Sequence, residues 1–336
     1  MTTVDLTRAP LADFFQRAIT YLRVSVTEKC NLRCVYCMPE SGLPWLRRED
    51  VLTYGEIAEI VRAAASVGVR SIRLTGGEPL VRPNLHRLIE EIAAIEGIDD
   101  IALSTNGILL EDCIDDLVAA GLRRVNVSLD TLQAQRFEDI SRRPGLERVL
   151  RGIDRAIDAG LSPVKVNCVV MRGRNDDELE AFAELTRARE IFVRFIEVMP
   201  VRENLDMQRA AYLSSEDILE RLGALGDLEA VTGPSGNGPA RYFSYPNARG
   251  ALGVISPLSH EYCDRCNRVR LTADGKLRLC LFGEGHIDLR TPLRAGATKA
   301  DLAARLRESM SIKPERHHLA LGERSSRMRA FSEIGG

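Results

Sequence analysis

Three cysteines lie within the short run CNLRCVYCMPE, at positions 30, 34 and 37, with the spacing C-x3-C-x2-C. Cysteine binds metals as thiolate, and four thiolates close a tetrahedral zinc site or saturate an iron–sulfur cluster. Three thiolates on a 4Fe–4S cluster leave one iron without a protein ligand, and that iron can bind a small chelating molecule. We therefore expect Cys30, Cys34 and Cys37 to hold such a cluster, with a zinc site completed by a distant ligand as the alternative.

A second triplet, Cys263, Cys266 and Cys280, has the spacing C-x2-C-x13-C. By spacing alone it suits zinc, with His260 or His286 as the fourth ligand, as well as it suits an iron–sulfur cluster. The residues NRVRLT between these cysteines place two arginines, at 268 and 270, on one side of an extended strand. A structural zinc site has no need of them, whereas a polyanion beside a cluster does. This favours a second cluster.

The other two cysteines, Cys113 and Cys168, lie in an expected helix and an expected strand, where they are interpreted as small buried hydrophobic residues. The N-terminal residues do not resemble a secretory signal, and no apolar run reaches the length of a membrane span. A net charge of −2 gives no reason to expect nucleic-acid or membrane binding. These features predict a cytoplasmic protein without disulfides.

From residue 20 onward, short β-rich runs alternate with amphipathic helical ones. Strands are predicted at 21–27, 71–75, 100–105, 124–129, 163–170 and 191–198. Helices are predicted between them, for example at 53–68 and 146–160, where apolar residues recur at helical spacing and a glycine follows. Six such units predict a parallel sheet, either open or curled into a barrel.

Polar or glycine-rich segments follow the ends of these strands. The first cysteine triplet follows the first strand. At the ends of the later strands lie, in chain order, GGEP (76–79), TNG (105–107), SLD (128–130), Asn167 and EVMP (197–200). In βα barrels, ligand-binding residues lie at the carboxyl ends of the strands. The pattern predicts an incomplete (β/α)6 barrel of the TIM type, with one concave mouth and an open side.

Three parts of the chain are predicted: an N-terminal extension (1–20), the partial barrel (21–230) and a C-terminal region (231–336). The boundary rests on TGPSGNGPARY at 232–242, which is rich in turn-forming residues. We expect the C-terminal region, with its second triplet and a helix at 299–310, to close the open side of the barrel.

The first triplet, with Tyr36 before its last cysteine, is similar to the signature of the radical S-adenosylmethionine (SAM) superfamily, and GGEP is similar to that superfamily's second motif. The resemblance implies that the open iron chelates SAM. One electron then cleaves SAM to methionine and a 5′-deoxyadenosyl radical.

Within that superfamily, the chain resembles the GTP 3′,8-cyclase family of molybdenum cofactor biosynthesis over nearly its whole length. The resemblance is carried by both triplets and by IRLTGGEPLVR, STNG, NVSLD, FIEVMP, CNRVRLT and the final Gly335-Gly336. It implies removal of the C3′ hydrogen of GTP, attack of that carbon on guanine C8, and a cyclic dihydroguanosine triphosphate as product.

The resemblance also implies roles for individual residues. Both triplets hold 4Fe–4S clusters, the second near guanine. The SAM pocket is lined by Tyr36, Gly77, Ser128 and Met199. The residues that bind GTP are Arg23, Arg73, Ser104, Lys165, Arg194, Arg268 and Arg270. Arg23, Gly335 and Gly336 are implied to be catalytic, the glycines by threading into the active site, where glycine lets the backbone approach closely.

The cationic residues agree with an elementary charge argument. A triphosphate carries about four negative charges, which clustered arginine and lysine side chains can meet with charge-assisted hydrogen bonds. Two positions depart from the family pattern. Ser71 stands where relatives often carry lysine, and Ser104 stands where threonine is expected, although the hydroxyl is retained.

The resemblance implies GTP as substrate, an electron donor, a downstream pterin-forming enzyme and a homodimer as partners. Two other functions are considered. A different radical SAM enzyme with an auxiliary cluster, such as a peptide-modifying maturase, would not require the NRVR arginines or the GG tail. A non-catalytic iron–sulfur or zinc scaffold would not cleave SAM.

Overall fold

The structure, a computed structural model, describes residues 10–199, 205–283 and 285–317. One twelve-stranded sheet runs through these residues in the order β12-β11-β10-β1-β2-β3-β4-β5-β6-β9-β8-β7. The eight strands from β10 to β9 in this order are parallel, and the outer pairs on both sides are antiparallel. Strands β12 and β7 end the sheet at opposite edges, so the barrel is incomplete, as the sequence predicts.

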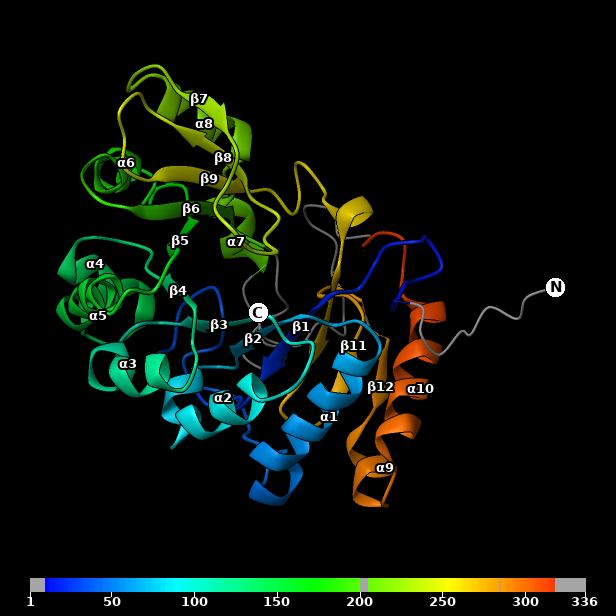
Figure 1. Cartoon of the computed structure of the whole chain (residues 1–336). Coiled ribbons are helices and arrows are strands. Elements are labelled where there is room, and N and C mark those ends of the chain that lie inside the picture. The colour runs from blue at the N-terminus through cyan, green and yellow to red at the C-terminus, as the bar shows by residue number, and fades with distance from the viewer. Residues whose placement is uncertain (1–9, 200–204, 284, 318–336) are drawn as a thin grey trace.

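The six predicted strands are confirmed. They are β1 (Tyr21–Ser25), β2 (Ser71–Thr75), β3 (Asp100–Thr105), β4 (Arg124–Ser128), β5 (Val164–Val170) and β6 (Ile191–Glu197). The helices that alternate with them are α1 (Tyr54–Ser66), α2 (Leu85–Ala93), α3 (Leu110–Ala119), α4 (Ala134–Ser141), α5 (Leu146–Asp158) and α6 (Leu179–Ala188). These helices form an arc outside the curved sheet (Figure 1).

The segments after β6 extend the sheet at both edges. Helices α7 (Leu205–Ala211) and α8 (Ser215–Gly223) precede β7 (Glu229–Val231), β8 (Arg241–Ser244) and β9 (Ala251–Ile255), and β9 pairs with β6. The chain then crosses to the other edge, where β10 (Arg268–Leu271) pairs with β1, followed by β11 (Lys276–Arg278) and β12 (His286–Asp288). Helices α9 (Arg290–Arg294) and α10 (Lys299–Ser309) end the described chain, and α10 packs beside α1 (Figure 1).

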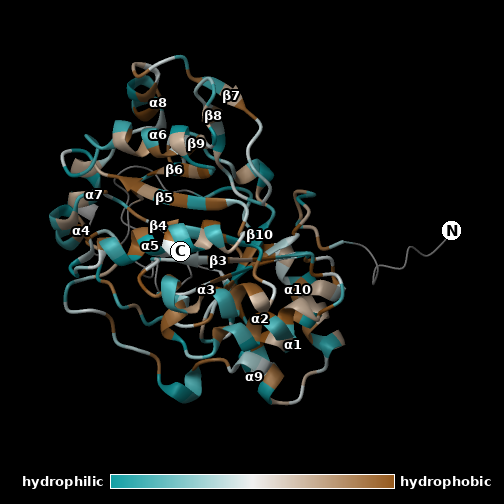
Figure 2. Cartoon of the chain, turned by 60° about the vertical axis from the view of Figure 1, so that its left-hand side comes forward, coloured by the Kyte–Doolittle hydropathy of each residue, from teal (hydrophilic) through white to brown (hydrophobic). Residues whose placement is uncertain are grey.

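Buried aliphatic side chains from the strands and the inner sides of the helices form one large core. Figure 2 shows the corresponding pattern, with hydrophobic residues concentrated on the strands and hydrophilic residues on the outer turns of the helices. Helix α1 illustrates the local cause. Thr53 caps it and exchanges hydrogen bonds with Glu56 at its first turn, while Ile57, Ile60 and Val61 recur at helical spacing and are fully buried. Among the described residues, none of the helices combines the length and apolar character needed to cross a lipid bilayer.

The glycine-rich run at 232–242 is a turn between β7 and β8, as its composition predicts, but it does not lead away from the barrel. Asn237, Gly238 and Pro239 line the central cavity. The division of the chain at residues 20 and 230 stays a prediction; residue 230 lies within β7, and the same sheet continues through β8 and β9.

Candidate active site

A cavity with a volume of about 280 Å³ occupies the inside of the partial barrel. Among the residues with predicted roles, fourteen line it: Arg23, Cys30, Cys34, Tyr36, Cys37, Arg73, Gly77, Ser104, Ser128, Lys165, Arg194, Met199, Arg268 and Arg270. The second cysteine triplet lies next to it, since Tyr262, Arg268 and Leu281 are lining residues adjacent to those cysteines in the chain. Gly335 and Gly336 lie outside the described residues. The structure therefore brings together residues from both ends of the barrel.

The first cysteine loop follows β1 at the carboxyl end of the parallel strands. Its backbone turns tightly, with the amides of Cys37 and Met38 both donating to the carbonyl oxygen of Cys34. Burial raises the pKa of the Cys30 thiol to about 11 and that of Cys34 well above its ordinary value. Such thiols become thiolates only when a cation compensates them, which is what an iron–sulfur cluster supplies.

Sulfur spacing tests whether the triplets suit a cluster or a single ion. Tetrahedral zinc with Zn–S bonds of about 2.3 Å holds its sulfur ligands about 4 Å apart. Within the described parts of the chain, neither triplet brings its three sulfur atoms within 4.8 Å of one another. All six cysteines are free thiols. Neither triplet, as described, is therefore closed around a single tetrahedral ion.

The GGEP turn holds the cysteine loop in place. Gly77 donates its backbone amide to Thr27, and Glu78 donates its amide to the carbonyl of Lys29. A Cβ atom at Gly77 would collide with the backbone oxygens of Glu28 and Lys29, so only glycine allows this approach.

The carboxylate of Glu78 connects this turn to the TNG segment after β3. It accepts hydrogen bonds from the Thr105 hydroxyl (2.7 Å) and the Asn106 amide (2.6 Å). Burial raises the pKa of Glu78 to about 7, although these hydrogen bonds lower it. The Asn106 side chain in turn donates to Asn31 in the cysteine loop at 2.7 Å. Glu78 and Asn106 thus position the loop from two neighbouring strand ends.

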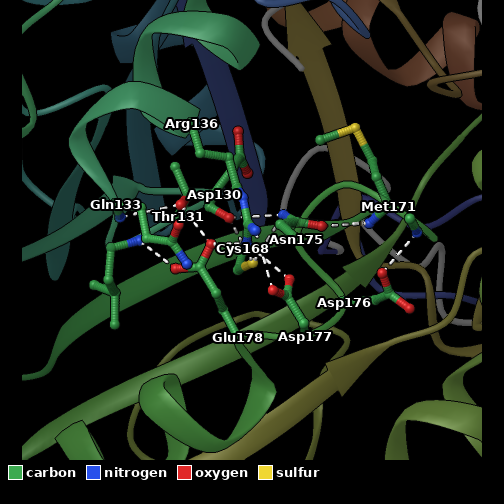
Figure 3. Close-up of polar contacts among 12 residues, drawn as sticks. Asp130, Thr131, Gln133, Arg136, Cys168, Met171, Asn175, Asp176, Asp177 and Glu178 are labelled. Atoms are coloured by element: carbon green, nitrogen blue, oxygen red, sulfur yellow. Dashed lines mark hydrogen bonds and ion pairs between the residues drawn. The ribbon is translucent and has the colours of Figure 1, made fainter.

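A polar network joins the segments after β4 and β5 (Figure 3). The Asn175 side chain donates to the Asp130 carbonyl (2.6 Å) and accepts from the Met171 amide (2.7 Å). Buried Glu178 accepts from the Thr131 hydroxyl at 2.6 Å and pairs with Arg136. These contacts hold Asp130, whose carboxylate accepts a hydrogen bond from Tyr36. Of the predicted SAM-pocket residues, Ser128 ends β4 and Met199 follows β6, both on the cavity wall.

The predicted GTP-binding cations lie side by side because the strands are in register. Arg23 on β1 is opposite both Arg73 on β2 and Arg270 on β10. Burial lowers the pKa of Arg270 to about 9, with further lowering from the charges of Arg23 and Arg268. Burial likewise lowers the pKa of Arg194 to about 10. Gathering like charges in a buried place is unfavourable, so these arginines indicate a site for an anion.

Tyr21 lies among these arginines. Its hydroxyl accepts a short hydrogen bond from Arg73 Nε, and the Arg268 guanidinium lies 5.8 Å from its ring centroid. Burial alone would raise the pKa of this phenol, but the charges of Arg73, Arg23 and Arg268 outweigh burial and lower it to about 8.

Lys165 and Asn126 lie deeper in the same wall, where register places Asn126 between Ser104 and Lys165. Burial lowers the pKa of Lys165 to about 6, and the charges of Arg194, Arg124 and Arg73 lower it further. Among the described residues, Asn126 Oδ1 and Arg268 Nε are buried without a hydrogen-bond partner. Both residues line the cavity, so these polar groups are available to a ligand.

The second triplet lies at the amino ends of the strands, opposite the first. Cys263 begins a 3-10 turn, and Cys266 lies two residues before the start of β10. Lys313 is buried and donates to Cys266 Sγ at 3.5 Å and to the Arg268 carbonyl at 3.2 Å. Burial raises the pKa of Cys266, but the charges of Lys313 and Arg268 outweigh it and bring the pKa below its ordinary value. A thiolate ligand is stabilised there.

Three side chains beside this triplet are close enough together to hold a single ion. Ligand atoms of Glu261, Cys263 and His317 lie within 4.8 Å of one another. His260, one of the two zinc ligands considered above, instead pairs with Glu216 at 2.5 Å and is half-exposed.

Four lining or positioning residues were not predicted: Tyr21, Asn126, Asn237 and Lys313. Glu78 and Asn106 lie in the GGEP and TNG segments that were expected at the strand ends, although no individual role was predicted for them. Two of the four had a signal in the sequence, because Tyr21 has the same strand parity as Arg23, and Asn126 the same parity as Ser128. Nothing local singles out Asn237 or Lys313. At Ser71, where a lysine was expected, the hydroxyl accepts a hydrogen bond from the Asn237 side chain at 2.8 Å.

Two protein families match different parts of the chain. Residues 24–186 match the Radical SAM superfamily, and residues 191–319 match Molybdenum Cofactor Synthesis C. Over 327 residues the chain is 48% identical to the GTP 3′,8-cyclase of Pelotomaculum thermopropionicum, covering 97% of this chain and all of that protein. The GTP 3′,8-cyclase of Moorella thermoacetica is also 48% identical, over 326 residues, with the same coverage.

Solved structures support the fold. SuiB of Streptococcus suis bound to its precursor peptide SuiA has a TM-score of 0.60 at 12% identity, covering 82% of this chain and 63% of that one. SuiB bound to S-adenosylmethionine gives a TM-score of 0.56 at 14% identity, covering 84% and 63%. At such low identity these matches show only that the fold, a partial barrel, is shared.

Proposed function

Because the chain belongs to the GTP 3′,8-cyclase family of radical SAM enzymes, we propose that it converts GTP to (8S)-3′,8-cyclo-7,8-dihydroguanosine 5′-triphosphate in molybdenum cofactor biosynthesis. The observation that carries the proposal is one cavity that is lined by the first cysteine triplet, by residues beside the second triplet, and by a wall of arginine and lysine. A peptide maturase or a metal scaffold does not need that cationic wall.

Cys30, Cys34 and Cys37 hold the 4Fe–4S cluster that binds SAM. When bound, this cluster supplies the electron that cleaves SAM into methionine and a 5′-deoxyadenosyl radical. Gly77, Ser128 and Met199 form the wall of the SAM pocket, and Tyr36 is held against that wall by Asp130. The chain's part is to orient SAM and to exclude water from a reactive carbon radical.

Arg23, Arg73, Ser104, Lys165, Arg194, Arg268 and Arg270 bind GTP. The charges of the arginines, and of Lys165 once it is protonated, offset those of the triphosphate, and the register of the strands fixes the spacing of these side chains before substrate arrives. Hydrogen removal from ribose C3′ leaves a carbon radical that forms a bond to guanine C8. One electron and one proton then complete the dihydroguanine ring. We assign Arg23 to the reacting end of this site, together with Gly335 and Gly336.

Cys263, Cys266 and Cys280 hold a second 4Fe–4S cluster near guanine, with Lys313 stabilising the Cys266 thiolate. The further partners that we propose are an external electron donor, a downstream pterin-forming enzyme and a second copy of the chain in a homodimer.

The test is anaerobic reconstitution followed by metal analysis and incubation with SAM, GTP and a reductant. Two clusters require about eight irons per chain. We expect 5′-deoxyadenosine to form in amounts that depend on GTP, together with the cyclic product. Cys30→Ser should abolish SAM cleavage. Cys263→Ser should halve the iron content. Cys113→Ser, in helix α3, should change neither SAM cleavage nor the iron content.

The competing functions predict different results. Zinc at the second triplet, held by Glu261, Cys263 and His317, would leave about four irons per chain. Modification of a peptide without binding of GTP would indicate a maturase. A protein that holds iron but never cleaves SAM would be a scaffold.

A further inference from the structure

Asn126 lies in the middle of β4 and lines the cavity. Its side chain is 6% exposed, and within the described chain its Oδ1 is buried without a hydrogen-bond partner. A buried amide oxygen without a donor is unfavourable, and in folded proteins nearly all such atoms are bonded. The oxygen therefore indicates a bound group that supplies a hydrogen-bond donor.

The polar side chains on the neighbouring strands are bonded to other groups. Register places Asn126 between Ser104 on β3 and Lys165 on β5. The Ser104 hydroxyl accepts from Arg73 Nη1 at 3.4 Å, and Lys165 Nζ donates to the Ser235 carbonyl at 2.9 Å. The donor that matches Asn126 therefore comes from a molecule in the cavity.

The inward side of β4 carries no net charge. Side chains alternate along a strand, so Arg124, Asn126 and Ser128 share one face of β4. Arg124 is neutralised by Asp100, to which its Nε donates at 2.8 Å. Asn126 and Ser128 are uncharged. This part of the wall therefore differs from β1, β2 and β6, which carry arginines, and it suits a neutral part of a nucleotide better than the phosphates.

The position of Asn126 in the sheet indicates which neutral part it meets. Ser128, which belongs to the wall proposed for SAM, is two positions further along β4, about 6.6 Å away. Strands β3, β2 and β1 lie between β4 and β10, which separates Asn126 from the second triplet. In the proposed function, SAM acts on the ribose and the second cluster lies near guanine. The ribose is thus the part of GTP that lies closest to Asn126.

We propose that Asn126 binds a ribose hydroxyl of the nucleotide, and that this contact makes the enzyme select ribonucleotides over deoxyribonucleotides. This rests on the proposed function. Ionised phosphates offer only acceptor oxygens, whereas a ribose hydroxyl donates to Oδ1 and gives this oxygen its missing partner. The same bond holds the sugar beside the SAM wall. A deoxynucleotide leaves the oxygen buried and unbonded, which lowers affinity.

The experiment measures binding of GTP, 2′-deoxy-GTP and 3′-deoxy-GTP by calorimetry to the anaerobically reconstituted enzyme without reductant. We expect the unchanged chain to prefer GTP about tenfold over the analogue that lacks the bound hydroxyl. Asn126→Leu keeps the branched shape and removes the acceptor. It should bind GTP about tenfold more weakly and that analogue as before, so the preference is lost. The analogue that shows the effect identifies the hydroxyl.

Denaturant unfolding separates recognition from a structural role. Since Asn126 Oδ1 has no partner within the described residues, Asn126→Leu should not lower the unfolding midpoint. Asn175→Leu is the contrast and should lower it clearly, because the Asn175 side chain bonds to two backbone carbonyls and to the Met171 amide. Asn247→Gly, at an exposed position with φ +63° between β8 and β9, should bind all three nucleotides like the unchanged chain.

An unchanged preference in Asn126→Leu, or no preference in the unchanged chain, would overturn the inference. Equal weakening of all three nucleotides would also overturn it, since the amide would then serve the phosphates or the structure alone. If Asn126→Leu does not fold, Asn126→Ala, which adds no bulk, should lose the same preference, and retention of it overturns the inference. Failure of the unchanged chain to bind GTP would instead overturn the proposed function.

Inosine triphosphate, which lacks the guanine amino group, tests the other donors of the nucleotide. We expect the preference for GTP over inosine triphosphate to fall in Asn126→Leu by the same factor as GTP affinity if the amide serves guanine, and this outcome would overturn the inference. Equal weakening of GTP and inosine triphosphate, with the deoxy analogue unaffected, supports the ribose contact.

Discussion

The Tyr36 hydroxyl donates a hydrogen bond to Asp130 Oδ2 at 2.7 Å, which ties the first cysteine loop to the end of β4 across 94 residues of sequence. Asp130 Oδ1 accepts from the Val169 amide at 2.9 Å. Burial raises the pKa of Asp130 to about 6, although both hydrogen bonds lower it. Tyr36, beside Cys37, is therefore held by Asp130 after β4, and Asp130 is held in turn by the backbone of β5.

Tyr36→Phe should destabilise the protein by about 1–3 kcal/mol, because it leaves a buried carboxylate oxygen without its donor. Denaturant unfolding measures this, and a weaker affinity for SAM should accompany it. Tyr54→Phe is the matched control, since the Tyr54 hydroxyl donates to the Pro83 carbonyl in an exposed place. Equal stability of the two variants would contradict the importance of the Tyr36–Asp130 contact.

Gly77→Ala should prevent loading of the first cluster. The added Cβ would collide with the backbone of Glu28 and Lys29, so the cysteine loop must move. Iron analysis should show about half of the metal retained, held by the second triplet. Gly55→Ala, in α1 with no atom within 4 Å of the added Cβ, should load iron normally. Normal loading of Gly77→Ala would refute the packing argument.

Arg17→Met should be strongly destabilising and should release the second cluster. Buried Arg17 pairs with Asp13 at 2.6 Å and donates to the carbonyls of Cys263 and Glu315, each at 2.6 Å. Its loss leaves a buried unpaired carboxylate, which costs about 3–5 kcal/mol.

Denaturant unfolding tests this expectation. Asp13→Asn combined with Arg17→Met should recover part of the loss, because the unpaired charge is then gone. Arg47→Met, at a pair exposed to solvent, should change stability by only about 0.5 kcal/mol. A small effect of Arg17→Met would mean that the N-terminal segment does not hold the second cysteine loop.

Binding of GTP should take up a proton through Lys165. With its pKa lowered to about 6, this amine is neutral at pH 8, and the triphosphate should raise that pKa by attracting the charged form. GTP affinity should therefore fall as pH rises above 8. In the free protein, the unfolded chain binds more protons than the folded one between the lowered pKa and the ordinary one, so Lys165 makes stability rise with pH in that window.

Calorimetry at pH 8, in two buffers with different ionisation enthalpies, counts the protons. At this pH the phosphate itself is fully ionised, since its last pKa is about 6. We expect uptake of about one proton for the unchanged chain and clearly less for Lys165→Met, where the partly ionised phenol of Tyr21, with its pKa of about 8, accounts for what remains. No uptake in the unchanged chain would show that Lys165 is charged before GTP binds.

Much of this protein is determined by local sequence. The six strands and their helices follow from periodicity, because side chains alternate along a strand and recur every 3.6 residues along a helix. The same alternation places Arg268 and Arg270 on one side of β10. The first cysteine triplet and GGEP are short-range patterns that can be recognised in the sequence, whereas the spacing of the second triplet leaves zinc and an iron–sulfur cluster as alternatives.

The tertiary structure decided what depends on segments far apart in the chain. It paired β9 with β6 and β10 with β1, at opposite sides of the six-stranded parallel core, which brings residues beside the second triplet to the cavity that the first triplet lines. It also brought Asn237 to Ser71 and Lys313 to Cys266. These contacts arise only when the barrel packs, since each partner is specified by a different part of the chain. For the same reason, the lowered pKa values of Tyr21 and Lys165 come from charges on neighbouring strands and could not be predicted from the sequence around them.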